Sequence, residues 1–110
     1  MRFARFMLVE LRIDGPVRPT TGATLVVTQD EPRPGVLGPV GWDVSAQLES
    51  HLPEGPECFI EGRTADGRVF SGQANVTNET MSSSHRGTTW RIELQGSGPL
   101  EGLDPDVDLH

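Results

Sequence analysis

Alternation of apolar and polar side chains near the C-terminus constrains the fold of this chain most strongly. In residues 88–95, Thr88, Trp90, Ile92 and Leu94 occupy alternate positions, and Thr89, Arg91, Glu93 and Gln95 lie between them. Successive side chains of a β-strand point to opposite faces, so a spacing of two predicts a strand with one buried face. We therefore expect this row to face a core.

A β-hairpin is expected just before this strand. Residues 57–63 and 68–77 each carry an apolar row, and residues 64–67 separate them and end in Asp-Gly. Asp-Gly tolerates the positive φ angles that a tight hairpin turn requires. With a polar loop at residues 78–87, these segments predict a C-terminal meander of three strands.

Three further segments are candidates for strands. Residues 6–13 alternate with a period of two, which predicts that Met7, Val9, Leu11 and Ile13 share a buried face. Residues 23–28 hold a short apolar run between polar residues, which is typical of a buried strand. Residues 42–52 alternate like a strand but also repeat at helical spacing after Asp43. We favour the strand.

Together these segments predict an all-β fold, either a small antiparallel sandwich or a partly open barrel of about six strands. The chain has 110 residues, of which 35% are hydrophobic, and this leaves room for one core. We expect a single β domain over residues 1–103. Residues 104–110 are acidic and contain proline, so we expect a flexible tail there.

Charge and composition argue against several classes of partner. The formal net charge of -7 opposes binding to the phosphates of nucleic acid. No stretch reaches the roughly 20 apolar residues of a membrane-spanning helix, and no signal-peptide pattern is present. The one cysteine, Cys58, suits a reducing compartment, so we expect a cytoplasmic protein. Lysine and tyrosine are absent, which indicates a GC-rich bacterial or phage genome.

No group of residues has the spacing of a catalytic or metal site. Cys58 lies in the apolar row of its strand, where a thiol usually serves as packing. Residues 82–84 and His85 resemble a polar loop, and residues 104–110 lack the glycine and distal glutamate of a calcium loop. We therefore expect no enzyme activity, no cofactor, and no catalytic or metal-binding residues.

Aromatic side chains supply the candidate contact residues. Phe3 and Phe6 precede the first strand, and Phe59 falls on the face opposite Cys58. These three phenylalanines are candidates for an interface with a subunit or partner; burial within the monomer is the alternative. Trp42 follows a loop rich in glycine and proline, which makes it the candidate platform for stacking a ligand.

The C-terminal third resembles the closing strands of phage and phage-like tail tube subunits. The resemblance covers residues 65–68 (ADGR), 70–76 (FSGQANV), 87–89 (GTT) and 94–100 (LQGSGPL). It implies a β-sandwich that stacks as rings and that has no catalytic residues.

These observations favour a non-catalytic binding or assembly domain that acts through β surfaces or strand edges. Its partner would be another protein or a second copy, and a self-assembling structural subunit is the specific form that the resemblance implies. One alternative is a β-barrel that binds a small ligand or carbohydrate. Another is an acidic inhibitor or immunity-type protein that binds a basic partner.

Overall fold

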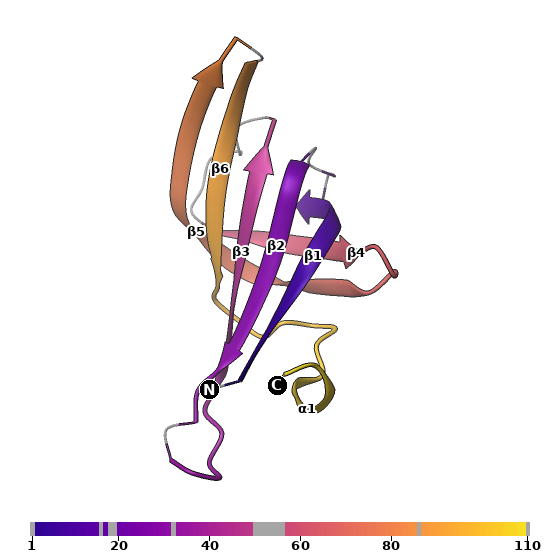
Figure 1. Ribbon diagram of the computed structural model, residues 1–110, viewed down its shortest axis with the longest axis vertical. Helices are drawn as coiled ribbons and strands as arrows, with labels where there is room; N and C mark the ends of the chain where they lie inside the picture. Colours follow the sequence, from indigo (N-terminus) through magenta and orange to yellow (C-terminus); the bar gives the residue numbers. More distant parts are fainter. Residues whose placement is uncertain are drawn as a thin grey trace.

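Six antiparallel strands form one sheet that closes on itself (Figure 1). The computed structural model describes residues 2–15, 17, 20–31, 33–49, 57–85 and 87–109. The elements are β1 (Arg2–Ile13), β2 (Thr20–Gln29), β3 (Val40–Leu48), β4 (Glu57–Thr64), β5 (Val69–Ser84), β6 (Gly87–Gly96) and α1 (Pro105–Asp108). Hydrogen bonds join them in the order β1-β2-β3-β6-β5-β4 and back to β1. The predicted all-β fold and its C-terminal meander are confirmed.

The core lies inside this ring and is built from alternate residues of each strand. The buried apolar side chains of β2, β3 and β6 are Ala23, Leu25, Val27, Trp42, Val44, Ala46, Leu48, Ile92 and Leu94. The predicted alternation is confirmed for residues 42–48, which form a strand rather than a helix. In β6 it is confirmed for Ile92 and Leu94, whereas Thr88 and Trp90 are only partly buried. The apolar run predicted at residues 23–28 lies in a strand. Residues 50–52, the rest of that segment, lie outside the described residues.

The predicted inward row of β1 is wrong for its first half. Met7 and Val9 are 63% and 58% exposed, whereas Leu8 is buried. The pairing of β1 with β4 shifts register between Leu8 and Glu10, so a bulge changes which positions face the core. Leu11 is then buried as predicted. A strict period of two cannot reveal such an inserted residue.

The polar loop predicted at residues 78–87 is also wrong. β5 continues to Ser84, and its ladder with β6 runs to the pair Ser84↔Gly87 after a register shift between Val76 and Asn78. All described side chains of residues 77–85 are exposed. Because water contacts both faces of these strands, their residues carry no apolar row, and the sequence resembles a loop.

The C-terminal segment differs from the flexible tail that the sequence predicts. Ser71 and Glu101 exchange two backbone hydrogen bonds of 3.1 and 2.7 Å, which hold the segment along β5. The chain then turns through α1, and Leu109 is buried in the core with 3% exposure. The C-terminal segment is polar in composition, but Leu109 is buried and Asp108 forms an ion pair with Arg68.

Trp42 joins β3 to β5, β6 and the C-terminal segment. Its indole Nε1 donates a hydrogen bond of 2.9 Å to the carbonyl oxygen of Gly98. A Cβ atom at Gly72 would lie 2.8 Å from Trp42 Cζ2, and one at Gly96 would overlap the indole ring. The ring therefore needs glycine at both positions, and only a backbone without side chains admits it.

Replacing Gly96 with alanine tests this contact. We expect Gly96→Ala to lower the free energy of unfolding by about 1–3 kcal/mol, because the new methyl group overpacks the site against Trp42. The matched control is Gly98→Ala, whose Cβ would meet only Gln73 Cβ at 4.0 Å. That control should change stability by less than about 0.5 kcal/mol. Urea unfolding of both variants, followed by tryptophan fluorescence, gives the comparison, and equal losses would contradict it.

Candidate interaction surfaces

The three candidate interface phenylalanines do not form one patch. Phe3 and Phe59 are 55% and 44% exposed on the outer face, but Phe6 points inward and its ring centroid lies 4.7 Å from that of Phe70. Phe3 pairs with Thr28 near the start of β1. Phe59 lies beyond the other end, where its carbonyl accepts a hydrogen bond of 2.8 Å from the amide of Asp14. At about 3.3 Å per residue, the two exposed rings lie roughly 35 Å apart along the strand.

The residues considered for chemistry lie in the core or are dispersed. Trp42 is 3% exposed, so its ring offers no platform for a ligand in this structure. Cys58 is buried, and burial, reinforced by the charges of Asp14 and Glu57, raises the pKa of its thiol. Within the described residues, no group of three or more histidine, cysteine, aspartate or glutamate side chains could hold a metal ion.

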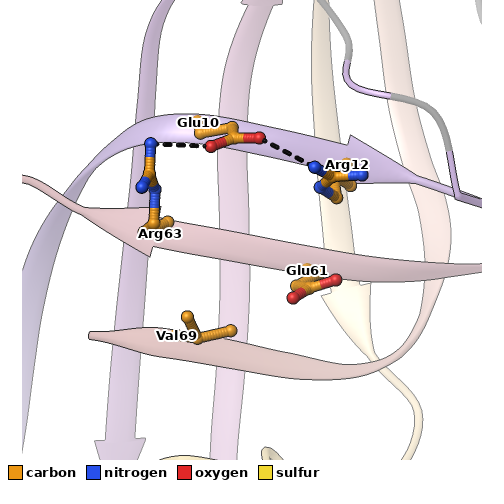
Figure 2. A pocket seen from close by; sticks show the side chains of 5 residues that line it. All are labelled: Glu10, Arg12, Glu61, Arg63 and Val69. Atoms are coloured by element: carbon orange, nitrogen blue, oxygen red, sulfur yellow. Dashed lines mark ion pairs between the residues drawn. The ribbon is translucent and has the colours of Figure 1, made fainter. Parts of the chain in front are cut away.

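A charged depression of about 180 Å³ lies on the outer face of β1, β4 and β5 (Figure 2). Glu10 lies on the β1 side of the depression and forms ion pairs of 3.3 Å with Arg12 and 2.8 Å with Arg63. Glu61 and Val69 complete the lining. Exposed pairs of this kind contribute about 1 kcal/mol or less. The pair Glu10–Arg63 joins β1 to β4, whereas Glu10 and Arg12 both lie on β1. The lining residues include no nucleophile and no histidine. We interpret the depression as a feature of the charged outer face of the sheet.

The end of β5 and the start of β6 form a two-stranded ribbon, residues 77–90, that extends beyond the other strands (Figure 1). The ladder between β4 and β5 ends at Glu57↔Asn75, and the ladder between β3 and β6 ends at Leu48↔Trp90. Past those pairs, the ladder pairs of the described residues join β5 and β6 to each other. Met81, 62% exposed, is the large apolar side chain of the β5 part.

The β5 part of the ribbon contains few residues of the types that discourage pairing with another chain. Natural edge strands carry lysine, proline or several charges, or are covered by another segment. Residues 77–84 contain neither lysine nor proline, and Glu79 is their single charged residue. The strand edge at residues 77–84 was not predicted, because residues 78–87 resemble a polar loop. The available signal was the threonine, methionine and serine content, which suits a solvated strand.

Arg68 binds the C-terminal segment to the closed sheet. Its guanidinium donates hydrogen bonds of 2.8 and 2.7 Å to the two carboxylate oxygens of Asp108. It also lies 5.2 Å from the ring centroid of Phe6 and 4.8 Å from that of Phe70. The hydrogen bond to Asp108 is the largest cause that raises the pKa of Arg68. A bidentate ion pair that stacks on two aromatic rings is specific in geometry as well as favourable in energy.

Neither a protein-family model nor a curated protein matches this chain. The resemblance to tail tube subunits therefore stays a prediction. In the part of the chain that the structure describes, no helix has the length and apolar character needed to cross a membrane.

Two substitutions in the C-terminal segment test whether it belongs to the core. We expect Leu109→Ala to lower the free energy of unfolding by about 2–4 kcal/mol, because it removes a buried side chain. Val107, two residues earlier, is 66% exposed, so Val107→Ala should cost less than about 0.5 kcal/mol. The measurement is urea unfolding of both variants. A small loss for Leu109→Ala would show that the segment is not part of the cooperative unit.

The raised pKa of Cys58 predicts slow reaction with thiol reagents. The thiolate is the reactive form, and raising the pKa lowers its fraction at pH 8. Together with the burial of the thiol, this should make labelling by a disulfide reagent about tenfold slower, or more, than in the unfolded chain. The comparison uses the native protein and the protein in about 6 M guanidinium chloride. Equal rates would contradict the buried position.

Proposed function

We propose that the protein is a non-catalytic assembly domain that pairs with a second copy through the open edge of β5. The observation that carries the proposal is the ribbon: its β5 strand continues to Ser84, nine residues past Asn75, where the described ladder with β4 ends. The backbone N–H and C=O groups along a strand edge are a template for another strand. An isolated two-stranded ribbon is only marginally stable in water, so a third strand would stabilise it.

The side chains of the edge favour pairing with an identical strand. A two-fold axis is the commonest symmetry of homodimers, and it places the same strand antiparallel to itself. With the axis at Met81, Thr80 faces Ser82 and Glu79 faces Ser83 of the second copy. The two exposed methionines then contact each other. An axis at Glu79 would instead place two carboxylates directly opposite, which is destabilising. The register centred on Met81 therefore combines apolar contact with separated charges.

Other parts of the molecule support assembly rather than chemistry. The thiol of Cys58 and the indole of Trp42 both lie in the core, where they serve packing. The ring closes the sheet along β1 to β6, which removes most strand edges. The β5 edge of the ribbon lies outside this closed ring, and pairing with a second copy would use that edge.

Lysine at the proposed contact tests the proposal. We expect the unchanged chain to rise in mass from 12.0 kDa towards twice that value as concentration increases. Met81→Lys should remain at 12.0 kDa, because two ammonium groups would meet at the axis. The measurement is light scattering after size exclusion, from about 1 μM to 1 mM, the range that detects weak dimers.

Met7→Lys is the matched control, because Met7 is 63% exposed on the outer face of β1 and Met81 is 62% exposed. It should associate like the unchanged chain. The proposal would be contradicted if the unchanged chain stayed monomeric at every concentration. It would also fail if Met7→Lys abolished association and Met81→Lys did not, since the contact would then lie on β1.

A further inference from the structure

Two hollows on the outer face of the sheet meet at Ser45 of β3. The first has a volume of about 250 Å³ and is lined by Gly22, Thr24, Ser45, Ala46, Gln47 and Arg91. The second has a volume of about 330 Å³ and is lined by Asp43, Val44, Ser45, Thr77, Glu93 and Leu94. Because Ser45 lines both hollows, they form one polar depression across β2, β3, β6 and β5, here called the Ser45 site.

A missing side chain opens the first hollow. Gly22 pairs with Gln47 across β2 and β3, and Ser45, the next outward position of β3, pairs with Thr24. A Cβ atom at Gly22 would meet nothing within 4 Å, so the space beside its backbone is open. Glycine at one outward position and serine at a neighbouring one therefore leave a hollow between longer polar side chains.

A β-bulge in β5 adds a residue to the wall of the second hollow. The register of β5 with β6 shifts between Val76 and Asn78, which makes Thr77 the extra residue. The hydroxyl of Thr77 donates a hydrogen bond of 3.2 Å to the carbonyl oxygen of Glu93. Bulges re-aim a side chain in this way and are frequent next to active sites.

Side chains of opposite charge lie in the two hollows. Arg91 lines the first, and Asp43 and Glu93 line the second. Asp43 pairs with Gln95, the next outward position after Glu93, so the two carboxylates are diagonal neighbours on β3 and β6. Diagonal neighbours lie about 7–8 Å apart, which lets one cation between them contact both carboxylates.

The charges of the Ser45 site do not pair with one another. Arg91 and Glu93 occupy successive outward positions of β6, and at about 3.3 Å per residue their Cα atoms lie roughly 7 Å apart. Among the residues that the structure describes, Arg91, Asp43 and Glu93 take part in no ion pair. Each charge can therefore contact a ligand group of opposite sign.

We propose that the Ser45 site binds a small zwitterion, a free α-amino acid, with its carboxylate at Arg91 and its ammonium group between Asp43 and Glu93. A guanidinium donates two parallel hydrogen bonds to a carboxylate, which fixes the orientation of the ligand. The lining residues include no aromatic side chain on which a sugar ring would stack, and this favours a zwitterion over a carbohydrate. The proposal does not depend on pairing at the ribbon.

Titration with compounds that carry one or both charges tests the proposal. The probes are L-serine, acetate, methylammonium and glucose, each added to ¹⁵N-labelled chain up to about 10 mM, which saturates a site with a Kd of about 1 mM. We expect serine to cause saturable shifts of the amide signals of Ser45, Arg91 and Glu93. Acetate and methylammonium each make only one of the charged contacts, so they should bind at least about tenfold more weakly. The absence of saturable shifts with serine, or equally tight binding of acetate or glucose, overturns the inference.

Two arginine variants locate the carboxylate contact. Arg91→Gln removes the guanidinium and should weaken serine binding at least about tenfold. The matched control is Arg5→Gln, because Arg5 is an exposed arginine on the outer face of β1 and lies outside the Ser45 site. It should bind serine like the unchanged chain. Unchanged binding by Arg91→Gln, or an equal loss in Arg5→Gln, overturns the inference.

A third variant, Gly22→Val, fills the first hollow and leaves every charge in place. A Cβ atom is accommodated there and Gly22 does not have a positive φ angle, so we expect far-ultraviolet circular dichroism equal to that of the unchanged chain. The added side chain should lower serine affinity at least about tenfold, because it occupies the space that the ligand needs. Unchanged affinity overturns the inference. These measurements leave the proposed contact at the ribbon untouched.

Discussion

The contact of Trp42 with Gly72 and Gly96 is the constraint on which the rest of the structure depends. These residues come from β3, β5 and β6, and the indole also bonds to Gly98 at the start of the C-terminal segment. A large buried side chain that meets bare backbone on three sides fixes the spacing of these strands. That spacing places β3, β5, β6 and the start of the C-terminal segment against one another.

Closure of the sheet distinguishes the ring of paired strands from two further parts of the chain, the ribbon and the C-terminal segment. Inside the ring, strand edges are paired and apolar side chains are covered. The ribbon leaves this ring as a polar, two-stranded extension, and the C-terminal segment lies against it as a short docked peptide. A strand edge such as that of the ribbon is an element through which β-proteins commonly join other chains, by strand addition. The assembly that we propose thus uses what the closed core leaves free.

The sequence predicts the parts of this fold in which one face is buried and the other solvated. Residues 42–48 alternate without interruption, and so do residues 91–95, so the inward rows there were predictable. Thr88 and Trp90, which continue the pattern into the ribbon, are only partly buried. The bulge after Leu8 was not, because an inserted residue changes the inward row without changing composition. The ribbon has water on both faces and therefore no pattern. The order of the C-terminal segment depends on Arg68, forty residues earlier, and local composition contains no sign of it.

A strand edge as the kind of contact surface was expected from the sequence, but its position on β5 was not. Strand edges follow from a small all-β chain, whereas the exposed rings of Phe3 and Phe59 lie at opposite ends of β1, and Phe6 is occupied by Arg68 and Phe70. The sequence indicated which aromatic residues were candidates for a contact, but only the register of the sheet separates those that face outward from those in the core.

Hydrogen exchange at the β5 edge tests the central claim most directly. Pairing with a second copy must protect backbone amides of residues 78–84 that point away from β6. Exchange is measured by NMR at about 10 μM and about 1 mM, on either side of a weak dimerisation equilibrium. The account predicts that alternate amides of this edge exchange more slowly at the higher concentration, while those of Phe3 and Met7 do not change. Equal exchange rates at both concentrations along the whole edge would contradict it.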